Sequence, residues 1–184
     1  LPPLPVTTEP ATYRESMDGE LSAIRLGSVL AVEKDEAAAL QLLGAILSDR
    51  MAMDLRETRG LSYSVGARFS ARADRGEFVA WINPPVERVD EGLEAIKSFI
   101  RDFDAASITQ EELDTIRSAR KGRMMMRRLS SMGQAYYLAM AELEGDIDGY
   151  LNALTAYDGI TLEDLQGVDQ NYLKTMPLVE VVID

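Results

Sequence analysis

The segment RMAMDLRETRGLSYSVGARFSARADRGEFVAWIN, residues 50–83, carries the clearest structural pattern in this chain. It begins as the end of a helix, and Gly60 fits a left-handed cap that stops it. Apolar and polar residues then alternate from Tyr63 to Arg72, which is the period of a half-buried strand. ADRG at 73–76 is turn chemistry, and a second strand follows at 77–83 before two prolines end it. The pattern predicts a helix followed by a β-hairpin.

Regular patterns continue on both sides of this segment. Upstream, residues 1–15 predict a linker-like extended segment, residues 21–32 a strand, and residues 34–49 and 51–58 helix. Downstream, a capping box is expected from Thr109 and Glu112. The expected downstream elements are helices at 87–103, from 109 onward, at 130–144, 148–157 and 161–172, and a closing strand at 178–183. This order predicts one α+β domain over residues 16–184, with an antiparallel-rich sheet and helices packed on one face.

The helix expected at 130–144 has its own apolar stripe. Met132, Tyr136 and Leu143 are expected to form its core-facing side, and Gly145 to end it. The methionines at 124–126, 132 and 140 are expected to fill the core and interfaces, because their flexible side chains adapt to irregular gaps.

Composition limits the class of protein. A chain of 184 residues with 46% hydrophobic and 27% charged residues fits one globular domain. No apolar run approaches the length of a membrane span. The start, LPPLP, lacks the basic and apolar regions of a signal peptide and has no initiator methionine. We expect it to be a linker or the cut edge of a longer protein.

Charge and missing residue types exclude several kinds of site. The net charge of −12 argues against nucleic-acid binding, which needs a basic face. The chain has no cysteine and therefore no disulfide framework. It also has no histidine. Carboxylates alone suit hard cations better than catalytic zinc, so no metal site is expected here.

The stretch DLRETRGLSYSV, residues 54–65, resembles the L-R-E-x-R-G-L-x-Y-x-V signature of the pitrilysin, insulysin and mitochondrial processing peptidase superfamily. The resemblance covers roughly residues 20–175, including the hairpin and the helix that starts at Thr109. It implies one of the paired, similarly folded domains of a zinc peptidase, namely the second, non-zinc domain. The zinc-binding H-x-x-E-H helix would then lie in a separate domain, and this chain alone should be inactive.

The resemblance also implies two site residues. Arg56 and Tyr63 match the arginine and tyrosine that hold substrate carbonyls and support the oxyanion, for which a guanidinium and a phenol are suitable donors. The residues alone leave other interpretations open. Tyr63 could be a core residue on the strand face of Val65, and Arg56 could pair with Glu57 or Asp54. Gly60 is interpreted as structural, and the role of Arg59 stays open.

A basic stripe follows on the helix that starts at Thr109. Its members are Arg117, Arg120, Lys121, Arg123, Arg127 and Arg128. Three interpretations compete: a solvated face, a docking surface for an acidic partner domain, or a site for an acidic substrate. The solvated face is the default, because charge runs usually are solvated.

Two functional hypotheses result. In the first, the chain is the substrate-binding, chamber-closing domain of a zinc metallopeptidase, and its partners are a zinc-bearing N-terminal domain or subunit and a peptide substrate. The peptide would add as an edge strand, mainly to the zinc domain. In the second, the chain is a non-catalytic scaffold or partner subunit with no role in hydrolysis. In either case it should expose the surface that meets its other half. The compartment is open between bacterial periplasm and cytoplasm, of which we favour the periplasm.

Overall fold

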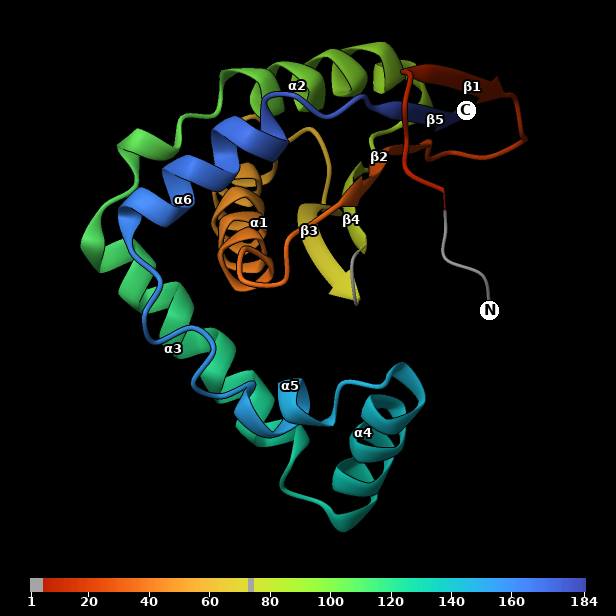
Figure 1. Ribbon diagram of the computed structural model, residues 1–184. Helices are drawn as coiled ribbons and strands as arrows, with labels where there is room; N and C mark the ends of the chain where they lie inside the picture. The colour runs from red at the N-terminus through yellow and green to blue at the C-terminus, as the bar shows by residue number, and fades with distance from the viewer. Residues whose placement is uncertain (1–4, 73–74) are drawn as a thin grey trace.

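The fold is an α+β sheet with helices, as expected. The computed structural model describes residues 5–72 and 75–184. Its strands are β1 (Ala11–Glu15), β2 (Ala23–Ala31), β3 (Val65–Arg72), β4 (Arg75–Ile82) and β5 (Val179–Ile183). They form a five-stranded sheet in the order β1-β5-β2-β4-β3 (Figure 1). β1 pairs with β5 in parallel, and the other pairs are antiparallel. The predicted hairpin is confirmed as β3 and β4.

The helices separate into two regions. Beside the sheet lie α1 (Ala37–Met51), the π-helix η1 (Ala52–Thr58), the 3-10 turn η2 (Val86–Arg88), α2 (Val89–Asp102), the 3-10 turn η3 (Ala105–Ser107), α6 (Leu162–Val168) and the π-helix η4 (Asp169–Leu173). The long helix α3 (Gln110–Arg127) leads away from them to α4 (Ser131–Glu144) and α5 (Ile147–Asn152) (Figure 1). We call residues 123–152, the end of α3 with α4 and α5, the helical lobe.

The core lies between α1 and the inner face of the sheet. Apolar residues of α1 at helical spacing are fully buried, among them Leu42, Leu43 and Ile46. Phe69 of β3 and Phe78 of β4 meet beneath them with ring centroids 4.8 Å apart. Gly44 lets α1 approach β3 closely, since a Cβ there would lie 2.6 Å from the backbone nitrogen of Phe69.

Burial alternates along the central strands, as expected for a sheet covered on one face. Ile24 and Leu26 of β2 are buried, whereas Arg25 between them is only half-buried. In β4, Phe78 and Ala80 are buried while Val79 is half-buried. The helices therefore cover one face of the sheet, which confirms that prediction.

The amino-terminal segment differs in part from its expected linker-like form. It is extended, but Ala11–Glu15 belongs to the sheet as β1 and pairs in register with Val179–Ile183. The proline-rich residues 1–4 lie outside the described residues, as do residues 73–74 of the expected turn.

The capping box expected at the start of α3 is only half present. The Thr109 hydroxyl accepts a hydrogen bond from the Glu112 backbone N–H at 3.2 Å. The Glu112 carboxylate does not return to the cap but accepts two hydrogen bonds from Arg50 of α1, at 2.8 and 2.7 Å. A bidentate, charge-assisted pair outcompetes a bond to a neutral backbone N–H.

The predicted core face of α4 is wrong. Met132, Tyr136 and Leu143 are 84%, 59% and 80% exposed. The helix itself forms as expected, capped by the Ser130 hydroxyl and ended by Gly145 with φ 71°. Its amphipathic pattern is therefore present, but nothing among the described residues covers it. Within the part of the chain that the structure describes, no helix is both long and apolar enough to cross a membrane.

Candidate functional site

The candidate site lies where α1 changes into a wider helix. After Met51 the helix continues without a break, but as a π-helix through Thr58. The backbone N–H of Arg59 donates to the carbonyl of Asp54, five residues back, at 2.9 Å. π-helical turns of this kind occur frequently at functional sites. Gly60 then adopts φ 56°, so its predicted left-handed conformation is confirmed.

Buried residues fasten this turn to the body of the protein. Leu55 and Leu61 are almost completely buried, and the N–H of Leu61 donates to the Leu55 carbonyl at 2.9 Å. The buried Ser62 hydroxyl donates to the carbonyl of Asn83, at the end of the hairpin, at 2.7 Å. The backbone around Arg56 and Tyr63 is therefore held between anchored points. Sequence analysis did not identify Ser62, although a serine in this motif was visible there.

Tyr63 lies outside the strand that it was expected to start. β3 begins at Val65, and the Tyr63 side chain is 91% exposed. The alternative interpretation of Tyr63 as a core residue is therefore wrong. Its hydroxyl makes no hydrogen bond with the described residues, so it is available to a ligand.

Arg56 is also turned outward. Its Nε donates to the Glu57 carboxylate at 2.8 Å, so the expected pairing is confirmed, but both side chains are exposed. Exposed pairs of this kind contribute little energy. Neither Nη group donates to any of the described residues. Arg56 and Tyr63 thus flank the fixed turn from either side and both keep unused hydrogen-bond donors.

Arg59, whose role sequence left open, supports the turn. Its guanidinium binds the Asp54 carboxylate through two contacts, at 3.1 and 2.8 Å. The neighbouring Gly60 carbonyl accepts a hydrogen bond from Arg88 at 3.1 Å. These contacts join the motif to itself and to the start of α2, which indicates a structural role for Arg59 and Gly60.

The ion pair beneath the site is the firmest one in this region. Arg50 holds Glu112, and it also donates to the hydroxyl of Ser107 at 2.8 Å. This hydrogen bonding lowers the pKa of Glu112 below its ordinary value. Nearby, burial raises the pKa of Asp49. The end of α1 is thereby tied to the start of α3, directly below the π-helix.

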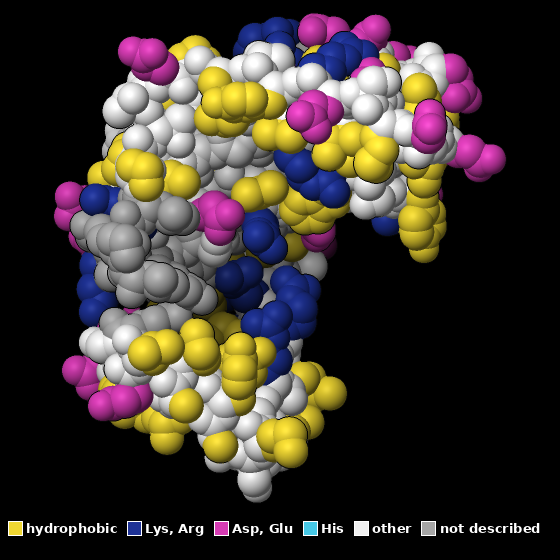
Figure 2. Space-filling view, turned by 90° about the vertical axis from the view of Figure 1, so that its right-hand side faces the viewer, with side chains coloured by type: hydrophobic (Ala, Val, Ile, Leu, Met, Phe, Trp, Pro, Cys, Tyr) yellow, Lys and Arg dark blue, Asp and Glu magenta, His cyan; other side chains and the backbone are white. Residues whose placement is uncertain are grey.

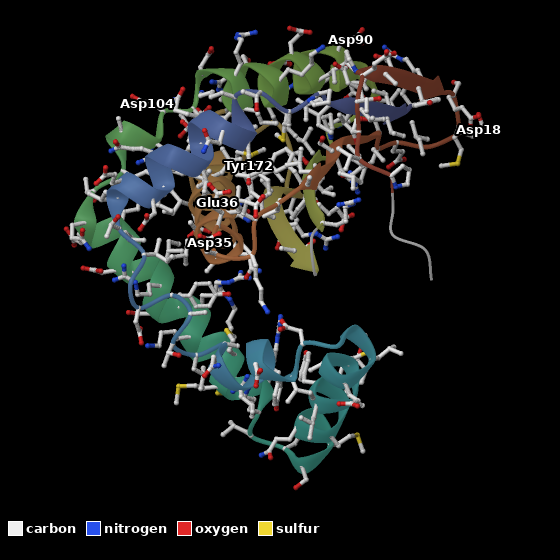
Figure 3. The ribbon with its side chains drawn as sticks, in the orientation of Figure 1. Asp18, Asp35, Glu36, Asp90, Asp104 and Tyr172 are labelled. Atoms are coloured by element: carbon white, nitrogen blue, oxygen red, sulfur yellow. The ribbon has the colours of Figure 1, made fainter. Side chains whose placement is uncertain are left out.

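A catalytic zinc ion does not fit the residues of this chain. The sequence holds neither histidine nor cysteine. Among residues 5–72 and 75–184, no group of three or more acidic side chains could hold a metal ion. Figure 3 shows Asp18, Asp90 and Asp104 on separate elements, while Asp35 and Glu36 lie at the start of α1. Glu36 there accepts a hydrogen bond from the Tyr172 hydroxyl.

The basic stripe on α3 serves mainly as an internal fastening. Arg117 donates to the backbone carbonyls of Tyr157 and Ile160 at 2.9 and 2.6 Å. Lys121 pairs with Asp158 at 2.6 Å. Arg128 stacks on the ring of Tyr150 at 4.2 Å and donates to its carbonyl. The default interpretation as a solvated face is wrong for these residues, because they hold the segment between α5 and α6 against α3.

Comparison with known proteins follows the same outline. A family model described as "Peptidase M16 inactive domain" matches residues 2–120. The uncharacterized zinc protease YmxG of Bacillus subtilis is 26% identical over 131 residues, which cover 69% of this chain and 31% of that protein. The chain spans less than a third of the length of the curated relatives first matched.

Two solved structures show the same fold. A peptidase M16 inactive domain from Pseudomonas fluorescens aligns with a TM-score of 0.79 and 20% identity, covering 95% of this chain and 43% of that one. Pitrilysin aligns with a TM-score of 0.73 and 15% identity, covering 97% of this chain and 20% of that one.

Proposed function

This chain belongs to the peptidase M16 inactive-domain family, and we propose that it is the non-catalytic, substrate-holding half of a zinc peptidase. The family match and the likeness to pitrilysin confirm the resemblance that the signature predicts. In this proposal the zinc site, an H-x-x-E-H helix, belongs to a separate domain or subunit, and this chain closes the chamber over a peptide. It supplies no zinc ligand itself.

One observation carries the proposal. Arg56 and Tyr63 face solvent with unused donors, although Leu55 and Leu61 beside them are fully anchored in the core. A turn held this firmly can place two donors in a fixed geometry at no further ordering cost. A purely structural turn has no need of an exposed tyrosine and a half-used arginine.

The two side chains suit the binding of peptide carbonyl groups. The free Nη groups of Arg56 provide a positively charged, planar set of donors, and the Tyr63 hydroxyl provides one more. Such donors stabilise a carbonyl oxygen most strongly where negative charge develops on it. Arg56 and Tyr63 would thus orient the substrate and support the oxyanion from the side opposite the zinc domain.

The test measures peptide hydrolysis by the assembled enzyme. Arg56→Ala and Tyr63→Phe should each lower kcat by about 10- to 100-fold, with zinc content and domain association unchanged. Arg101→Ala is the matched control for Arg56, because Arg101 also pairs with its following residue, Asp102, at an exposed site. Tyr13→Phe is the control for Tyr63, since Tyr13 is likewise an exposed tyrosine.

The competing function is a scaffold that takes no part in hydrolysis. If both site variants keep wild-type kinetics, Arg56 and Tyr63 do not contact the substrate, and the scaffold hypothesis is favoured. If the zinc-bearing partner hydrolyses peptides equally well without this chain, the substrate-holding role is excluded as well.

A further inference from the structure

The helical lobe presents an apolar stripe to solvent. Met132, Tyr136 and Leu143 lie four and seven residues apart along α4, the spacing of one helix face. All three are exposed, and no charged residue occurs from Leu129 to Ala141. Figure 2 shows the hydrophobic side chains gathered over the lower part of the molecule, where the helical lobe lies. The other exposed large apolar side chains of this lobe are Met125, Met126, Leu129, Leu138 and Leu151.

An exposed stripe of this kind indicates an interface. Single exposed apolar residues are common on protein surfaces, but a contiguous set at helical spacing is typical of a face that another element covers. The described residues contain no such element, and the rest of α4 is not charged enough to solvate the helix all round.

The lobe is only lightly held to the sheet region. The ion pair between Lys34, before α1, and Asp146, before α5, joins them at 3.0 Å, with the Lys34 side chain largely exposed. Such a pair contributes little. Inside the lobe, Arg127 stacks on Tyr137 and Arg128 on Tyr150, so the lobe keeps its own shape. A partner that covers the stripe would therefore also fix where the lobe stands.

We propose that the apolar stripe of α4 docks against the zinc-bearing domain of the same enzyme. The inference rests on the proposed function and names the surface that would carry it. A second copy of this chain is disfavoured, because each copy has a net charge of −12 and two copies repel each other. The solved M16 chain from Pseudomonas fluorescens has more than half its length outside the region that this chain matches. Its remaining part supports a covering domain of the expected size.

The native methionines provide the first measurement. Met132 on the stripe, Met53 in the π-helix and Met17 near the amino terminus are all exposed. Each can be oxidised by dilute hydrogen peroxide, and mass spectrometry gives a separate rate for each. Adding the separately purified zinc-bearing domain should slow oxidation of Met132 several-fold and leave Met17 unchanged.

The same experiment separates this inference from the proposed function. Protection of Met53 reports that the turn bearing Arg56 faces the partner, whereas protection of Met132 reports docking of the lobe. Met53 protected with Met132 unprotected overturns the docking inference and leaves the proposed function intact. Met132 protected with unchanged kinetics in Arg56→Ala and Tyr63→Phe supports docking and removes the substrate contact.

Substitution provides the second measurement. Met132→Lys with Leu143→Lys should weaken association with the zinc-bearing domain at least about tenfold, since buried apolar anchors dominate interfaces. The control pair, Met17→Lys with Leu21→Lys, adds the same charges to exposed residues elsewhere and should have no effect. Thermal unfolding should be unchanged in both.

Two results would overturn the inference. One is an unchanged affinity of the Met132→Lys, Leu143→Lys variant for the zinc-bearing domain. The other is dimerisation of the chain alone in analytical ultracentrifugation, abolished by the same two substitutions, which would make a second copy the occupant.

Discussion

The core around α1 and the helical lobe carry the same kind of sequence signal, and only the core buries it. In α1, residues at helical spacing such as Leu42 and Ile46 are fully buried against the sheet. In α4, Met132 and Leu143 at comparable spacing face solvent. An amphipathic pattern therefore shows that a helix has a face to bury, but not that the partner belongs to the same chain.

The largest expected difference between the two regions is in the cost of removing an apolar side chain. Phe78→Ala empties a fully buried position against Phe69 and should lower the free energy of unfolding by about 3–5 kcal/mol. Leu143→Ala should change it by less than about 0.5 kcal/mol, because that side chain is exposed. Urea unfolding measures both. A loss of comparable size for Leu143→Ala would mean that the lobe is packed after all.

Glycines in the two long helices should differ in sign. Gly44→Ala in α1 forces a Cβ against the backbone of β3, at 2.6 Å from the Phe69 nitrogen, and should destabilise by about 1–3 kcal/mol. Gly122→Ala in α3 meets open space and should stabilise by about 0.4–1 kcal/mol by restricting the unfolded chain. Thermal melts of the two variants give the comparison. A stabilised Gly44→Ala variant would contradict the close packing of α1 on β3.

Ion pairs should show the smallest difference. Glu112→Gln removes the partly buried pair with Arg50 and should cost about 1–2 kcal/mol at pH 7. Lys34→Gln removes the exposed pair with Asp146 and should cost about 0.5 kcal/mol or less.

The pair with Arg50 also predicts a pH dependence. The pKa of Glu112 is lowered in the folded state, so its contribution is complete above the pKa of the unfolded chain. It is lost as pH falls from about 4.5, the ordinary value, through the folded pKa. The stability difference between wild type and Glu112→Gln should therefore be constant from neutral pH down to about 5 and shrink below that. A difference that grows on acidification would contradict this assignment.

Much of the sheet region could be predicted from sequence because its signals are local. Alternation identified the hairpin, and Gly60 identified the end of the helix that precedes it. The exposure of Tyr63 could not be predicted, because alternation alone does not show that the strand starts two residues later, at Val65. The π-helical turn sets that start, and no residue type marks it.

Contacts between distant segments were also beyond reach. The bond between Glu112 and Arg50, and the carbonyl partners of Arg117, join residues that only the fold brings together. The exposure of the α4 stripe follows from a missing partner, and a pattern within one helix carries no information about that. The proposed roles of Arg56 and Tyr63 still depend on the resemblance together with their exposure.

The π-helix η1 has a consequence for how this motif can vary. Its wide turn, closed by the bond from the Arg59 N–H to the Asp54 carbonyl, accommodates one residue more than an α-helical turn would. Removing one residue would allow the α-helical form to return and rotate all that follows by about 100°. Leu55 and Leu61 could then not both reach the core. The segment should therefore accept changes of residue type far more readily than changes of length, and an alignment of its relatives should show it as a block without gaps.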